Sequence, residues 1–123
     1  MSVKIDFDQA LVNNFGEPEL AGNFPVRLGF ICSFALGRSW QGDKRDDQQK
    51  DNDWKLSLKI GKSGKDLERK DGEIRFGLLE LSNKEASHLS DVVRAVYADP
   101  RYGSQCALML EGDETPVTEE SKT

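Results

Sequence analysis

The stretch from Ser82 to Tyr97 constrains the fold most, because it carries both the start signal and the periodicity of a helix. Ser82 followed by Glu85 is a capping box, in which each side chain accepts a hydrogen bond from the other residue's backbone N–H. Behind this start, apolar residues recur with a period near 3.6: Ala86, Leu89, Val92, Val93 and Val96. Asp99–Pro100 ends the pattern, because proline disfavours helical backbone in the residue before it. The sequence therefore predicts an amphipathic helix whose apolar side needs cover.

Length and composition indicate one domain. A chain of 123 residues can bury one modest core, and 37% hydrophobic with 32% charged residues is typical of a globular protein. A net charge of −5, with both signs mixed, argues against binding nucleic acid through a general basic field. We predict a globular domain over residues 1–112 and a disordered acidic tail over residues 113–123, which lack an apolar pattern.

The ends and the cysteines indicate where the protein works. The N-terminus has no charged start followed by an apolar core, so we expect no secretory signal. The longest apolar run, near Leu28–Leu36, is too short to span a bilayer. Cys32 and Cys106 lie inside apolar runs and are expected to be buried reduced thiols, although their pairing stays open. We therefore expect a cytoplasmic protein without a membrane segment.

The most apolar stretch, Pro25 to Leu36, is predicted to be a central helix. Proline suits the first helical turn, and Gly37 suits a left-handed cap after the end. Phe30 and Phe34 widen the apolar stripe until little of the surface is left for water. A short terminal helix is predicted within Tyr102–Glu111, packing on the capped helix.

Three segments alternate apolar and polar residues, as half-buried strands do: Val3–Leu11, Trp54–Ile60 and Ile74–Leu81. A turn after the first leads to Glu19–Phe24, a weak candidate for the return arm of a hairpin. The sequence thus predicts a single α+β domain, in which a small antiparallel sheet is covered by two or three helices.

The middle segment has a competing interpretation. Trp54–Ile60 could instead end a helix that starts near Asp46 and stops at Gly61. The two i,i+4 apolar pairs of such a helix, Trp54/Leu58 and Leu56/Ile60, lie on nearly opposite faces, so it would have to be buried on two sides. The pattern therefore favours the strand.

The polar stretch Arg38–Asp53 has no periodicity and is predicted to be a solvated, mobile loop. Its only large apolar residue is Trp40, and tryptophan is enriched at binding hot spots. We hypothesise that Trp40, with Arg38 and Arg45 beside it, contacts a protein partner, whereas Trp54 belongs to the core. The alternative is that Trp40 folds back on the core.

Catalytic chemistry is sparse in this sequence. His88 lies on the polar side of the capped helix and could be a general base oriented by Asp91, but any solvated helix face shows such spacing. The GKSGK run within Gly61–Gly72 lacks the full spacing of a phosphate loop. We therefore predict no enzyme, no cofactor and no metal site, and we disfavour nucleic acid as a partner of the lysine-rich Lys55–Lys70 stretch.

Short motifs recur in a characteristic order along the chain. They are Asp6–Phe7 with Gln9 and Leu11, the apolar run Leu28–Leu36, Leu81–Ser82 with Glu85, and Leu110–Glu111–Gly112. This layout resembles small accessory proteins of tailed bacteriophages and prophages. The resemblance covers most of the chain, but its motifs are caps, turns and core positions, so it carries no catalytic residue across.

The resemblance raises the expectation of a phage origin. We predict a non-enzymatic protein-binding module, such as a phage accessory, assembly or inhibitor protein that acts on a host or phage protein in the host cytoplasm. Two alternatives stay open, namely a structural virion component in a homo-oligomeric array and a nucleic-acid accessory protein.

Overall fold

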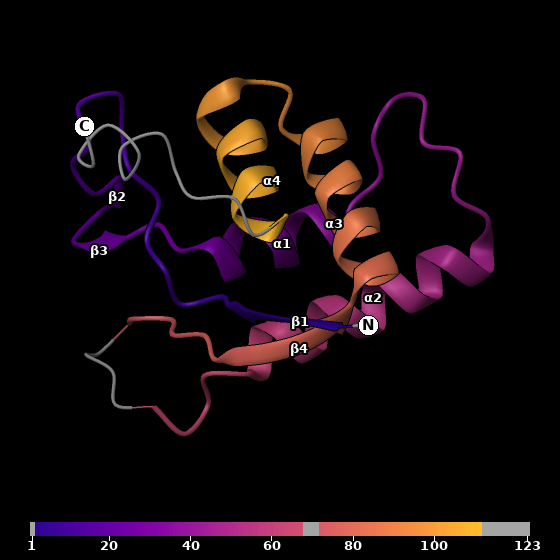
Figure 1. Cartoon of the computed structure of the whole chain (residues 1–123), viewed down its shortest axis with the longest axis horizontal. Helices are drawn as coiled ribbons and strands as arrows, with labels where there is room; N and C mark the ends of the chain where they lie inside the picture. Colours follow the sequence, from indigo (N-terminus) through magenta and orange to yellow (C-terminus); the bar gives the residue numbers. More distant parts are fainter. Residues whose placement is uncertain (1, 68–71, 112–123) are drawn as a thin grey trace.

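The computed structural model describes residues 2–67 and 72–111. Its elements are β1 (Ser2–Asp6), β2 (Leu20–Ala21), β3 (Phe24–Pro25), α1 (Leu28–Leu36), α2 (Asp47–Lys62), β4 (Leu78–Ser82), α3 (Asn83–Val96), a π-helical turn η1 (Pro100–Ser104) and α4 (Gln105–Leu110) (Figure 1). The predicted α+β class is confirmed, with four α-helices in the described part of the chain. The predicted tail over residues 113–123 lies outside the described residues.

The main sheet joins strands from distant parts of the sequence. β1 pairs antiparallel with β4, so that Val3 lies opposite Leu81 and Ile5 opposite Leu79. Alternation places these four side chains on one face, where Ile5 and Leu81 are buried. The predicted strands Val3–Leu11 and Ile74–Leu81 are therefore both present but shorter than expected. β1 ends at Asp6, and β4 begins only at Leu78.

The predicted hairpin arm is divided into two short strands. β2 and β3 form a second antiparallel pair, with Leu20 opposite Pro25, around a turn at Gly22 whose positive φ of 65° suits glycine. The Glu19 backbone N–H donates to the Leu11 carbonyl, at 2.9 Å, just before β2. Pro25 therefore lies in a strand, and the prediction that it opens a helix is wrong.

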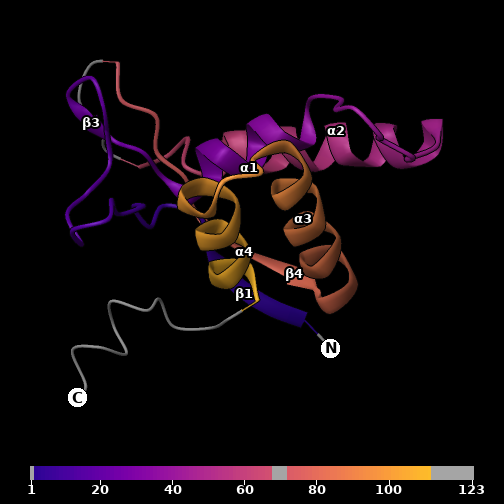
Figure 2. The ribbon, with the colours of Figure 1, turned by 90° about the horizontal axis from the view of Figure 1, so that it is seen from above.

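Helix α1 is central, as predicted, but one of its sides is open. It packs against α2, α3 and α4, and Figure 2 shows α3 and α4 side by side along it. Its inner face is buried and consists of Leu28, Gly29, Ile31, Cys32, Ala35 and Leu36. Phe30 and Phe34 turn away from this face and stay 36% and 49% exposed, so the predicted all-round burial is wrong. Gly37 follows the helix with φ −86°, which is not the predicted left-handed cap.

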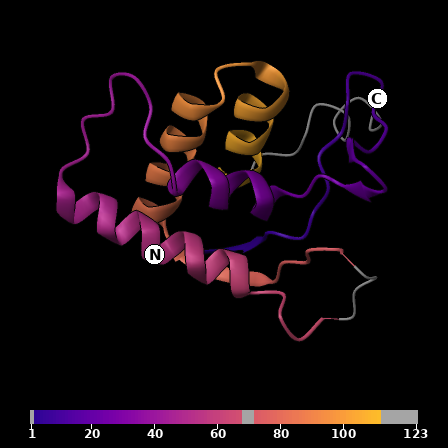
Figure 3. The ribbon, with the colours of Figure 1, turned by 180° about the vertical axis from the view of Figure 1, so that it is seen from behind.

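The predicted strand Trp54–Ile60 is wrong, and the competing helix is correct. α2 starts after Asp46, whose carboxylate accepts from the Gln49 backbone N–H at 2.8 Å, and it continues through Lys62. The helix also takes the second half of the predicted loop Arg38–Asp53. Its length is plain in Figure 3, where it runs in the foreground below α1.

Helix α2 is buried on one side only, and its buried face is largely polar. The buried residues are Asp53, Ser57 and Ile60. The Trp54/Leu58 pair is left on the surface, and Trp54 is 54% exposed. The prediction that Trp54 belongs to the core is therefore wrong.

Helix α3 confirms the capping-box prediction. The Glu85 backbone N–H donates to Ser82 Oγ at 3.0 Å, and the Ser82 N–H donates to Glu85 Oε1 at 2.9 Å. Its buried residues are Ala86, Leu89, Ser90, Val92 and Val93. The terminal helix α4 packs against α3, also as predicted.

The cysteines behave as the sequence predicts. Cys32 of α1 and Cys106 of α4 are both free and buried in the core. Burial raises the pKa of the Cys106 thiol to about 12, so the thiol stays neutral at ordinary pH. Among the described residues, no helix has the length and apolar character that crossing a membrane requires.

Candidate functional site

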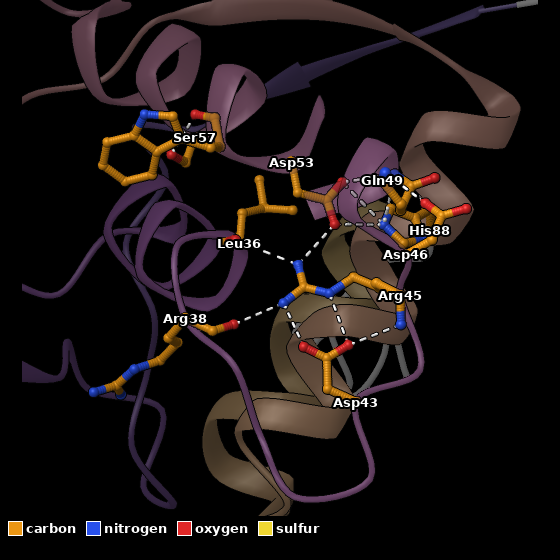
Figure 4. A network of polar contacts seen from close by, with 10 residues as sticks. Leu36, Arg38, Asp43, Arg45, Asp46, Gln49, Asp53, Ser57 and His88 are labelled. Atoms are coloured by element: carbon orange, nitrogen blue, oxygen red, sulfur yellow. Dashed lines mark hydrogen bonds and ion pairs between the residues drawn. The ribbon is translucent and has the colours of Figure 1, made fainter. Parts of the chain in front are cut away.

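Arg45, one of the three predicted partner-binding residues, lies at the centre of an ion network beneath the α1–α2 loop (Figure 4). Its guanidinium donates to Asp53 Oδ2 through Nη1 at 2.8 Å. It binds Asp43 with two further atoms, Nε at 3.0 Å and Nη2 at 2.8 Å. All three side chains are shielded, with Asp53 only 2% exposed. Bidentate contacts of this kind are among the stronger hydrogen bonds in proteins.

The same guanidinium ties the loop to the fold. Nη2 donates to the Arg38 carbonyl at 2.8 Å, and Nη1 also reaches the Leu36 carbonyl at 3.4 Å. Its flat face lies over the Trp40 indole, 4.3 Å from the ring centroid, which is a cation–π contact. Trp40 is partly buried against the core. Arg45 and Trp40 therefore hold residues 38–46 in place, and the alternative in which Trp40 folds back on the core describes the structure.

The Asp53 carboxylate also connects α2 to α3. His88 Nε2 lies 2.9 and 3.0 Å from its two oxygens, and Gln49 Nε2 donates to Oδ1 at 2.9 Å (Figure 4). An ionised carboxylate only accepts hydrogen bonds, so His88 Nε2 must carry a proton. The residue that orients His88 is thus Asp53, 35 positions away, and not Asp91, which the disfavoured catalytic interpretation would require.

The network lowers the pKa of the Asp43 carboxylate. Hydrogen bonds from Arg45 lower the pKa of Asp43 to about 2. The same hydrogen bonds from Asp43 raise the pKa of Arg45. Both groups are therefore charged throughout the neutral range, and their ion pair helps to hold the loop in place.

A different kind of surface lies between α1 and α2, which we call the α1–α2 groove. It is an open groove of about 440 Å³, lined by Ser33, Phe34, Gly37, Arg38, Trp54, Ser57 and Leu58. Trp54, Phe34 and Leu58 are 54%, 49% and 39% exposed. The Phe30 ring, 5.0 Å from that of Phe34, extends the apolar surface along α1.

Gly37 and Arg38 shape the end of this groove. A Cβ at Gly37 would lie 3.4 Å from the Trp54 ring, which is an ordinary contact distance, so the indole packs against the end of α1. The Arg38 guanidinium lies over the Phe34 ring, 5.7 Å from its centroid. Arg38 forms no ion pair within the described residues. The described arginines that do are Arg27, Arg45, Arg75, Arg94 and Arg101.

The structure therefore separates the three predicted partner-binding residues. Arg38 borders the α1–α2 groove, whereas Trp40 and Arg45 belong to the network beneath the loop. The hypothesis missed Phe34, Trp54 and Leu58. A signal for them was present, because Phe30/Phe34 and Trp54/Leu58 are i,i+4 apolar pairs that fall outside the buried spacing of their helices.

The described residues contain no cluster of three or more His, Cys, Asp or Glu side chains placed to hold an ion. Comparison with protein-family models, with curated proteins and with solved structures found no match to this chain.

Proposed function

We propose that this protein is a non-enzymatic protein-binding module whose α1–α2 groove receives an apolar segment of a protein partner. The observation that carries the proposal is the joint exposure of Phe34, Trp54 and Leu58 along one groove. Scattered exposed apolar side chains are ordinary, but a contiguous set with polar groups at its margin is typical of interaction sites. Tryptophan is also the residue type most enriched among binding hot spots.

The charge at the groove defines the partner further. Arg38 is the basic side chain of the groove lining, and no carboxylate among the described residues pairs with it. A guanidinium favours a carboxylate partner with two parallel hydrogen bonds. The partner segment therefore presents an apolar side chain to Trp54 and an Asp or Glu to Arg38.

The proposal extends to the kind of protein. The motif order described above supports a phage-encoded accessory, assembly or inhibitor protein, whose partner belongs to the host or to the phage. Such proteins need a binding surface rather than a reaction centre, and the groove supplies one.

A structural virion component in a homo-oligomeric array is the second candidate. The observation that favours it is the two-stranded β1–β4 sheet, in which each strand has one edge without a strand partner in the described residues. Leu78, 62% exposed, lies on β4 beside such an edge. Open edges and exposed apolar strand residues can pair with another copy.

The experiment compares how matched variants of the tagged protein capture a partner protein. The groove variants are Trp54→Ala and Arg38→Glu, and the control is Phe15→Ala, which removes an exposed aromatic ring from a turn outside the groove. We expect a protein that wild type and Phe15→Ala both retain and that both groove variants lose. The purified partner should then shift the Trp54 emission to the blue in a Trp40→Phe background, because binding removes water from the indole.

Two results would overturn the proposal. Capture that survives both groove variants would place the interface elsewhere. Light scattering that shows a large assembly, lost on a charged substitution of Leu78 and kept in Trp54→Ala, would favour the homo-oligomeric array instead.

A further inference from the structure

The opposite flank of α2 faces α3 across an open cleft of about 510 Å³, which we call the α2–α3 cleft. Lys55 and Lys59 line it from α2, and Lys84 and His88 line it from α3. Each pair is spaced i,i+4 and therefore lies on one face of its helix. Four basic groups thus border one cleft in a protein whose net charge is −5.

The acidic residues that line this cleft are already engaged. Glu85 Oε1 accepts the Ser82 N–H in the capping box, and Asp53 is paired with Arg45 at 2.8 Å. The three lysines form no ion pair within the described residues.

His88 is placed to take part in such binding. Its Nε2 proton points to the buried Asp53 carboxylate, and no described group bonds Nδ1. A helical side chain leans toward the preceding turn, which brings the ring toward Lys84. The carboxylate fixes the orientation of the ring in the way that outer partners fix ligand-binding histidines. The imidazole therefore presents Nδ1 to a group that enters the cleft, and Nδ1 donates a hydrogen bond to an anion when it carries the second ring proton.

We propose that the α2–α3 cleft binds a small ligand that carries a phosphate group. A phosphate offers several oxygens and close to two negative charges, which matches lysines on two helices better than a single carboxylate does. The cleft volume falls in the range of small-molecule sites. An extended nucleic acid instead needs a longer basic track, so the ligand is compact. This site is separate from the α1–α2 groove, and the proposal of a phosphate ligand does not depend on the proposed protein partner.

The single histidine makes the test direct, since the imidazole signals in a proton NMR spectrum belong to His88 alone. Inorganic pyrophosphate is titrated into the full-length protein at constant pH and ionic strength. We expect a saturable shift of these signals. Lys59→Gln and Lys84→Gln should each weaken the fitted affinity by about tenfold, the equivalent of one charge-assisted hydrogen bond.

The matched control is Lys50→Gln, which removes the same charge from an exposed position of α2 that does not line the cleft. It should leave the affinity unchanged. The three substituted lysines, Lys50, Lys59 and Lys84, are exposed, so circular dichroism should show wild-type folding in each variant.

The proposal fails if the shift does not saturate, or if Lys50→Gln weakens binding as much as the cleft variants do, since either result indicates a diffuse ionic effect. It also fails if sodium citrate at the same charge concentration produces the same saturable shift and the same affinity. Displacement of pyrophosphate by a short single-stranded oligonucleotide at a lower phosphate concentration would replace it with a nucleic-acid surface.

Discussion

Helices α3 and α2 are held to the same core by different forces. α3 buries Leu89, Val92 and Val93 and closes its first turn with a capping box. α2 buries Asp53, Ser57 and Ile60, and the carboxylate of Asp53 is paired with Arg45 and hydrogen-bonded to His88. Apolar burial needs only the right spacing, whereas a buried carboxylate needs partners from other segments. The first kind of helix can be recognised from its own residues, and the second cannot.

This difference also explains why both candidate sites lie on α2. Two polar residues of α2, Asp53 and Ser57, face inward, and Trp54 and Leu58 are left on one flank, beside α1. Lys55 and Lys59 line the other flank, beside α3. Helix α3, which hydrophobic burial places, buries Leu89, Val92 and Val93 in the core.

The largest expected effect tests the apolar half of this contrast. Leu89→Ala should lower the free energy of unfolding by about 2–4 kcal/mol, because a fully buried leucine loses its transfer energy and leaves a cavity. Urea unfolding measures the loss, with the exposed Ser87→Ala of the same helix as control. A Leu89→Ala midpoint equal to that of Ser87→Ala would show that apolar burial does not place α3.

The next effect tests the polar half. Asp53→Ala should cost about 2–3 kcal/mol, because Arg45 and His88 lose a charged hydrogen-bond partner although Arg45 keeps Asp43. Asp51→Ala, an exposed carboxylate on the same helix, should change stability little. Equal unfolding midpoints for the two variants would mean that the network does not place α2.

Acid should weaken the ion pair between Asp43 and Arg45 that holds the loop. The pKa of Asp43 in the folded protein lies near 2, below its ordinary value of 3.8, so its ion pair adds stability above pH 4 that is lost as the pH falls toward 2. Asp43→Asn lacks this titrating group. The stability advantage of wild type over Asp43→Asn, measured by urea unfolding, should therefore shrink between pH 4 and pH 2. A constant advantage over that interval would contradict the ion pair.

A smaller effect sharpens the comparison at the start of α3. Ser82→Ala should cost about 1 kcal/mol, the usual contribution of an N-cap, because the Glu85 N–H loses its acceptor. Ser82→Asp keeps an acceptor at this position and should stay near wild type. If Ser82→Asp were as unstable as Ser82→Ala, the cap would not be what matters there.

The smallest effect is spectroscopic and separates the two tryptophans. Trp54 is 54% exposed, whereas Trp40 is partly buried beneath Arg45. In Trp40→Phe the remaining indole should therefore emit to the red and be quenched by iodide. In Trp54→Phe it should emit to the blue and be shielded. The reverse pattern would mean that Trp54 packs in the core.

Local patterns in the sequence determined much of this protein. The capping box and stripe of α3, the buried spacing of α1, the alternation in β1 and β4 and the apolar setting of the two cysteines each arise from neighbours a few residues apart. Such patterns are legible because helices and strands have fixed periods. The α+β class followed from these elements together.

The tertiary structure alone decided the character of α2 and of its two flanks. An inward aspartate is stable there only because Arg45 and His88 reach it, and His88 is 35 positions away. Without those partners the same residues are typical of an exposed polar stretch followed by a strand. The exchange of roles between Trp40 and Trp54 has the same cause, since burial depends on which residues the remote partners pull inward, and a one-dimensional pattern does not contain that information.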